Sequence, residues 1–225
     1  MENFELIHII LGGYTITEPV TAATNVVLSL LCFSLSIKLQ KNLYFKRNLE
    51  FKFWRNFFFF MGISTFLGVF SHGARHYLNM NQYTLLWLVM QSFSGYAMFF
   101  AEKATLKRYF NQLTFNKINP LLQLKFVIFI IAAFYYKDFM SVVVNSAVGF
   151  ISILIVNIHF LKKGRKTAIK MIIGILLGII AALFHVFKIG YNEWFNHNDL
   201  NHVIIALSLY VIYQFSKTVR VVENI

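Results

Sequence analysis

The stretch AIKMIIGILLGIIAALFHVFKI, residues 168–189, decides the fold class of this chain. It is an apolar run whose only charged residues, Lys170 and Lys188, lie close to its two ends. A helix needs ~20 mostly apolar residues to cross the hydrocarbon core of a bilayer. The stretch therefore predicts a transmembrane helix.

Further apolar runs of similar length predict an all-α integral membrane protein, a bundle of seven transmembrane helices in a single domain over residues 1–225. The composition agrees, because 58% of the residues are hydrophobic and 13% are charged, against ~25% charged in a typical soluble domain. Pro19 and Pro120 stand near the start of apolar runs, where a proline fits the first turn of a helix. The predicted spans are residues 18–38, 55–76, 83–102, 120–136, 139–161, 168–189 and 199–216.

The basic residues predict the orientation of the bundle. Of the 21 Lys and Arg residues, 18 fall on one side of the predicted spans, Lys46, Arg47 and Arg220 among them, and 3 fall on the other. Loops rich in Lys and Arg face the cytoplasm. We therefore expect an external N-terminus, a cytoplasmic C-terminus and a multi-pass protein of the plasma membrane, the inner membrane of a bacterium. The net charge of +12 sits in loops between apolar runs, so we expect no nucleic-acid partner.

The histidines gather at the external end of the predicted bundle. The stretch NEWFNHNDLNHVIIALSLYVIYQ, residues 192–214, places His197 and His202 around the start of the last span. His72 and His76 lie at the end of the second span, and their i, i+4 spacing puts both imidazoles on one helical face. Such pairs suit a metal ion, and polar groups buried in a bundle are costly unless they are paired or bind an ion. The sequence therefore predicts a buried metal site that uses these four histidines.

Other interpretations of single residues stay open. An imidazole at a membrane interface is common because the ring is amphipathic, and His76 and His197 taken alone fit that alternative better than a ligand role. Glu18 opens the first span, where an acid also stabilises the helix dipole. The candidate catalytic residues are Asp199, Glu18 and Ser71. The candidates for supporting positions around them are Asn25, Asn198, His185 and Gln91.

Three short stretches resemble the alkaline ceramidases, which share a wider superfamily with the adiponectin-receptor-like proteins. TEPVTAATNVVLSLLCF, residues 17–33, is similar to the family's opening, whose acidic residue and asparagine fall on Glu18 and Asn25. GVFSHGARH, residues 68–76, is similar to its Ser-x-x-x-His segment, and NHNDLNH, residues 196–202, to its closing His-x-x-x-His. The resemblance implies a zinc-dependent (Zn²⁺) hydrolase of ceramide-like lipid amides, with three histidine ligands from the second and seventh helices.

Two positions of the family pattern carry over to histidines of this chain. By position, His76 is the second-helix ligand and His202 is the last ligand of the seventh helix. The family's serine falls on His72, or its role passes to Ser71. The second-helix segment therefore departs from the pattern at its serine.

The remaining positions depart further. The first histidine of the closing motif falls on Asn198, so His197 or Asp199 has to take its place. The family's third-helix aspartate has no counterpart, since only Gln91 offers a polar side chain there. The resemblance therefore implies a rewired site or one that hydrolyses nothing.

The implied chemistry is that of a zinc hydrolase. Zinc with three protein ligands keeps one position open for a water molecule, whose pKa falls to about 7. The resemblance gives Asp199 or Glu18 the task of orienting or deprotonating that water. We expect a membrane lipid as the substrate or ligand, with its acyl chain among the apolar side chains of the bundle.

Three other function classes stay open for the chain. One is a lipid-binding or sensory protein that keeps the fold without catalysis. Another is an ion or proton transporter, although the cytoplasmic half of the spans carries almost none of the ionisable groups that a through-path needs. The last is a haem protein that uses histidines from two helices. A retinal protein is excluded, because residues 199–216 hold no lysine for a Schiff base.

Overall fold

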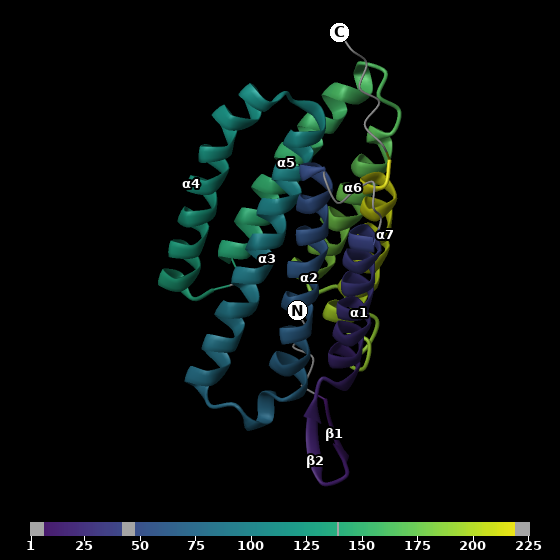
Figure 1. The fold of residues 1–225 in the computed structure, drawn as a ribbon. Helices are drawn as coiled ribbons and strands as arrows, with labels where there is room; N and C mark the ends of the chain where they lie inside the picture. The colour runs from purple at the N-terminus through teal and green to yellow at the C-terminus, as the bar shows by residue number, and fades with distance from the viewer. Residues whose placement is uncertain (1–6, 42–47, 139, 219–225) are drawn as a thin grey trace.

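The computed structural model describes residues 7–41, 48–138 and 140–218. This part of the chain forms an all-α bundle of seven helices that run up and down, as predicted, with a short β-hairpin projecting from one end (Figure 1). The elements are β1 (His8–Leu11), β2 (Tyr14–Thr17), α1 (Pro19–Lys41), α2 (Leu49–Gly73), the 3₁₀ turn η1 (Arg75–Tyr77), α3 (Met80–Tyr109), α4 (Gln112–Tyr136), α5 (Met140–Lys162), α6 (Ala168–Val186) and α7 (His197–Ser216).

Six helices, α1 to α6, are long and apolar enough to cross a membrane. The seventh, α7, falls short because polar residues fill its first two turns, between His197 and His202. By the length and composition of its helices, the chain is a multi-pass membrane protein. Lys46, Arg47 and Arg220, which entered the orientation argument, lie outside the described residues, as does the first residue of the predicted fifth span.

The end of α2 differs from the prediction. The helix stops at Gly73, and the chain turns through Ala74 into η1. His76 therefore lies beyond the helix, and the expected common face of His72 and His76 does not exist.

The two prolines differ in their positions. Pro19 is the first residue of α1, as predicted, where its missing N–H is not needed. Pro120 lies in the interior of α4, so the prediction of a first-turn proline there is wrong. The helix already begins at Gln112, where the side chain of Asn111 accepts a hydrogen bond from the backbone N–H of Thr114. This cap starts α4 in a polar stretch that the hydropathy pattern placed in a loop.

The N-terminal hairpin was not predicted. Gly12 and Gly13 join its strands with φ angles of 58° and 83°, which two-residue hairpin turns with positive φ require. Strand β2 leads directly into α1 through Glu18, whose backbone N–H donates to the carbonyl of Ile7 at 2.8 Å. The hairpin thus holds Glu18 at the end of the bundle.

The opposite end of the bundle is closed by a buried ion pair. Arg108 of α3 donates from Nε to Oε1 of Glu50 on α2 at 2.6 Å. The same guanidinium donates to the carbonyls of Phe215 and Thr218, at the end of α7, and stacks on the Phe215 ring. One side chain therefore ties three helices together.

Candidate functional site

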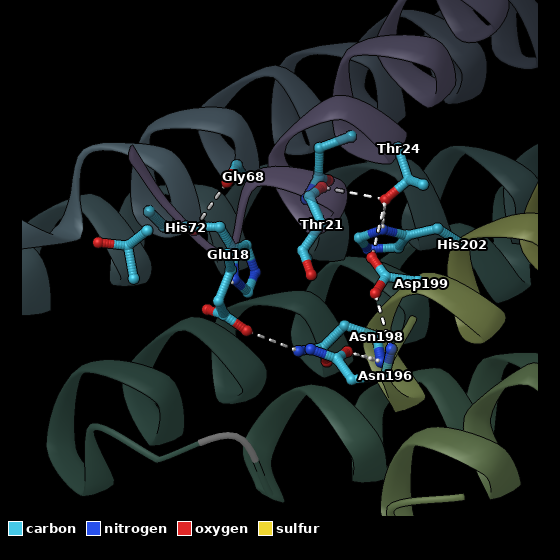
Figure 2. Close-up of polar contacts among 12 residues, drawn as sticks. Glu18, Thr21, Thr24, Gly68, His72, Asn196, Asn198, Asp199 and His202 are labelled. Atoms are coloured by element: carbon cyan, nitrogen blue, oxygen red, sulfur yellow. Dashed lines mark hydrogen bonds and ion pairs between the residues drawn. The ribbon is translucent and has the colours of Figure 1, made fainter. Parts of the chain in front are cut away.

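Glu18 and His72 form a carboxylate–histidine pair where α1 begins and α2 ends. Oε2 of Glu18 lies 2.8 Å from Nδ1 of His72, and the Glu18 side chain is 8% exposed (Figure 2). Burial raises the pKa of the Glu18 carboxyl, but the hydrogen bond and charge of His72, with the charge of Arg75, outweigh it and hold the pKa below its usual value. Glu18 is therefore a carboxylate that orients the His72 ring.

The backbone of Glu18 is strained. Its φ is +45°, in the left-handed region that residues other than glycine rarely adopt. Such a conformation costs on the order of 1–3 kcal/mol and persists only where the surroundings enforce it. Here the hairpin on one side and Pro19 on the other fix the chain, and the strain aims the carboxylate at His72.

A second oriented imidazole lies on α7. Nδ1 of His202 is 2.8 Å from Oγ1 of Thr24 on α1, and the same hydroxyl lies 3.4 Å from Oδ1 of Asp199 (Figure 2). The Thr24 hydroxyl also lies 3.0 Å from the carbonyl oxygen of Thr21. Its single proton goes to one of these two acceptors, so His202 donates from Nδ1 to the Thr24 oxygen. His202 then presents Nε2 as a free lone pair.

The two imidazoles share one arrangement. In His72 and His202 an oxygen engages Nδ1, while Nε2 makes no hydrogen bond to any residue in the described ranges. Metal-ligating histidines nearly always have this arrangement, because the outer partner fixes the tautomer and the ring orientation. The arrangement is the feature of the site that most resembles a metal centre.

Two more histidines complete the cluster. His185, in the last turn of α6, interacts electrostatically with His72 and His202, and its ring centroid lies 5.5 Å from that of His197. Asn198 joins the halves of the cluster, since its side chain contacts His185 and its Nδ2 lies 3.5 Å from Oε1 of Glu18. We call the following residues the histidine cluster: Glu18, Thr24, His72, His185, His197, Asn198, Asp199 and His202.

Asp199 has contacts that account for it without a catalytic role. It is fully buried, and Oδ2 accepts the backbone N–H of Asn196 at 2.9 Å. The Asn196 side chain in turn caps the first turn of α7, which completes a capping box. Asp199 therefore starts the helix and orients Thr24, and neither of its oxygens faces an open position.

Three of the predicted residues do not join the cluster. His76 is exposed in η1, with its ring edge-on to Tyr77. Ser71 is buried one position before His72 and contacts the sulfur of Met90 on α3, because successive helical residues point about 100° apart. Gln91 is 1% exposed, and its amide has no hydrogen-bond partner among the described residues.

Asn25 supports the cluster by packing. Its Nδ2 donates to the carbonyl of Thr21 one turn earlier, and its Oδ1 lies against Gly68. Gly68 is one turn before His72, so α1 and α2 approach each other closely just below the Glu18–His72 pair. A side chain at this glycine would separate the two helices.

We expect Gly68→Ala to lower the free energy of unfolding by about 1–3 kcal/mol, because overpacking a tight contact forces a shift of the backbone. The new Cβ would stand 2.6 Å from Oδ1 of Asn25. Thermal unfolding in detergent measures the effect. The control is Gly178→Ala, whose Cβ would stand 3.2 Å from the Phe150 ring. Equal losses in the two variants would contradict the role of the Gly68 contact.

The donor set of the cluster fits a zinc-class ion, but its geometry is incomplete. Imidazoles from α2, α6 and α7 supply the nitrogen ligands that zinc prefers. Within residues 7–41, 48–138 and 140–218, however, no three His, Cys, Asp or Glu side chains are placed to hold one metal ion together. The cluster is therefore a set of oriented imidazoles that lacks a closed coordination geometry.

Comparison with known proteins gives a family without a function. A model for a family of unknown function, DUF6962, matches residues 20–220. The chain belongs to this family. No curated protein and no solved structure matches it. The DUF6962 match covers every helix of the bundle except the first residue of α1, and it covers the whole histidine cluster apart from Glu18.

Two residues of the site were missed in the sequence. Asn196 could have been found, because Asn-x-x-Asp before an apolar run is a capping signal. Thr24 could not, since its contact with His202 joins residues 178 positions apart and leaves no local pattern.

Proposed function

We propose that this DUF6962 chain is a membrane hydrolase that binds a zinc-class metal ion at the histidine cluster and cleaves a lipid amide. The observation that carries the proposal is the matched pair of imidazoles, His72 and His202, each with Nδ1 held by an oxygen partner and Nε2 left open. The ceramidase resemblance of the same segments supports the substrate class.

The roles of the residues follow from their contacts. His72 and His202 are the first two donors, and His185, which interacts electrostatically with both, is the candidate for the third. Glu18 orients His72, while Thr24 and Asp199 orient His202. When bound, the metal supplies an activated water and polarises the amide carbonyl. Because the donors do not converge as they stand, the proposal requires at least one imidazole to turn when the ion binds.

The proposal includes an orientation. The positive-inside rule puts the ends of the bundle that carry Lys and Arg in the cytoplasm and the histidine cluster beneath the external surface of the plasma membrane. An amide-linked lipid of the external leaflet would then reach the cluster with its chains still in the bilayer. A ceramide-like lipid has this form.

A second candidate is a lipid-binding sensor that binds no metal. The observation that favours it is the absence, among the described residues, of three side chains placed to hold one ion. The Glu18–His72 and Asp199–Thr24–His202 contacts then serve as a buried polar network that fixes the end of the bundle. A transporter explains these oriented contacts less well, since it does not need both Nδ1 atoms fixed. A haem protein would hold its axial histidines in the same way, so its absorbance has to separate it from the zinc hydrolase.

Hydrolysis tests the two candidates against each other. Full-length protein in detergent is incubated with a ceramide-like amide and with a lipid ester of the same chain length, with and without added zinc. The hydrolase predicts zinc-dependent release of fatty acid from the amide. Binding of the amide without release, at any zinc concentration, would favour the sensor. Absorbance near the Soret region checks for haem in the same sample.

We expect Thr24→Val to weaken zinc binding by about 10–100-fold, the usual cost of losing a partner that orients a metal ligand. The substitution removes the hydroxyl that holds Nδ1 of His202 and keeps the side-chain shape. Competition with a chelating dye measures the affinity. The control is Thr65→Val, because the Thr65 hydroxyl bonds only to carbonyls of its own helix. Unchanged affinity in Thr24→Val would remove Thr24 from the site.

A further inference from the structure

A groove separates α4 from α5, away from the histidine cluster. Its volume is about 640 Å³, within the usual ~300–1,000 Å³ of small-molecule sites. In Figure 1, α4 lies at the outside of the bundle, so the groove opens on the surface that faces the membrane. Its apolar wall includes Leu124, Ile128, Ala132, Val144 and Val148.

The inner part of the groove holds no free charge. Nζ of Lys125 lies 2.8 Å from both carboxylate oxygens of Glu102, and Ser152 also donates to that carboxylate. The ammonium is thus neutralised where it meets the bundle, and only its methylene chain is left to line the groove. The inner part of the groove therefore offers no unpaired cation that could bind an anionic headgroup.

The end of the groove at the α4–α5 turn is recessed from the end of the bundle where α3 begins. Gly95 of α3 packs against the ring of Phe129 on α4, so the two residues lie at the same level of the bundle. From this level, 15 residues separate Gly95 from the start of α3, whereas only seven separate Phe129 from the end of α4. At 1.5 Å per residue, the eight extra residues of α3 reach ~12 Å beyond the α4–α5 turn. The contact of Gly149 with Met98 gives a similar offset, since Met98 is 18 residues from the start of α3 and Gly149 is nine residues from the start of α5. The turn is therefore recessed from the end of the bundle by about two helical turns.

This recessed turn carries two opposite charges, Lys137 and Asp138. Asp138 lines the groove and accepts weak hydrogen bonds from Ser141, at 3.3 Å from its N–H and 3.4 Å from its hydroxyl. No basic side chain of the described chain forms an ion pair with it. A carboxylate beside an exposed ammonium complements a headgroup that carries both a phosphate and an ammonium.

We propose that the α4–α5 groove binds a zwitterionic aminophospholipid from the surrounding bilayer. One acyl chain lies along the apolar wall, the lipid ammonium donates to Asp138, and the phosphate meets Lys137. This site is separate from the histidine cluster, and its function does not depend on hydrolysis at that cluster.

Native mass spectrometry of the full chain tests the site. Delipidated protein is titrated with phosphatidylethanolamine and with phosphatidylglycerol of the same acyl chains. We expect about tenfold tighter binding of phosphatidylethanolamine, the value of one charge-assisted hydrogen bond. Asp138→Asn should remove this preference. An equal affinity of the wild type for both lipids, or a preference that survives Asp138→Asn, would overturn the headgroup assignment.

Filling the groove tests its apolar wall. Ala132→Phe should abolish retention of both lipids, while the control Ile131→Phe, on the exposed face of the same helix, should retain them. Val144→Trp serves as a second filling variant, and thermal unfolding checks that each variant is folded. Lipid retention unchanged in the folded filling variants would show that the lipid binds elsewhere.

Discussion

His202→Ala lowers the affinity for zinc by more than about 100-fold, because the loss of an outer partner alone costs ~10–100-fold and this change removes the ligand itself. Thr24 holds the His202 ring at Nδ1, and the Thr24 hydroxyl in turn lies 3.4 Å from Asp199. The proposed zinc-dependent amide hydrolysis should fall with it to the level of a metal-free sample. Chelator competition and fatty-acid release measure the two effects on the same preparation.

The matched control is His76→Ala. His76 lies three residues beyond the end of α2, and it is exposed and outside the cluster. The account predicts unchanged zinc affinity for this variant. If His76→Ala lost zinc as His202→Ala does, the ligand set implied by the family resemblance, which pairs His76 with His202, would hold in place of the one proposed from the contacts.

We expect Arg108→Met to destabilise the fold by about 3–5 kcal/mol, the usual cost of removing one partner of a buried ion pair. The change removes the Arg108 partner of the Glu50 carboxylate, which is 2% exposed, and it removes the donors to the carbonyls that end α7. Thermal or denaturant unfolding in detergent measures the loss. The histidine cluster lies at the other end of the bundle, so folded protein should keep its zinc affinity.

Two controls separate the ion pair from the loss of a positive charge. Lys170→Met removes an exposed charge and should leave stability within about 0.5 kcal/mol of the wild type. Glu50→Leu combined with Arg108→Met removes both charges, and apolar replacement of a buried pair is often neutral. A double variant as unstable as Arg108→Met alone would show that the carbonyl contacts, and not the pair, hold this end together.

The helices were predictable because hydropathy is a local property. Each apolar run appears in the structure as a helix. The cap that starts α3 and the proline that starts α1 are also local signals, because each depends on a few adjacent residues. The boundaries were less predictable. α4 starts in a polar stretch with an asparagine cap, and α2 stops at Gly73 although the apolar pattern runs on.

The placement of His72, His197 and His202 at one end of the bundle was also predictable, since the alternation of spans puts the end of α2 and the start of α7 on the same side. The choice between His72 and His76 was not. It depends on a three-residue difference in where α2 ends, which moves His76 out of the helix. The close approach of Asn25 to Gly68 and the Thr24–His202 contact join distant segments, and no pattern within either segment encodes them.

Zinc K-edge X-ray absorption of the full-length protein, reconstituted with one equivalent of zinc, tests the metal site most directly. The account predicts nitrogen ligands at ~2.0–2.1 Å with the outer-shell scattering of imidazole rings, and a loss of that scattering in His202→Ala. A spectrum with oxygen ligands alone, or one that His202→Ala leaves unchanged, would contradict it.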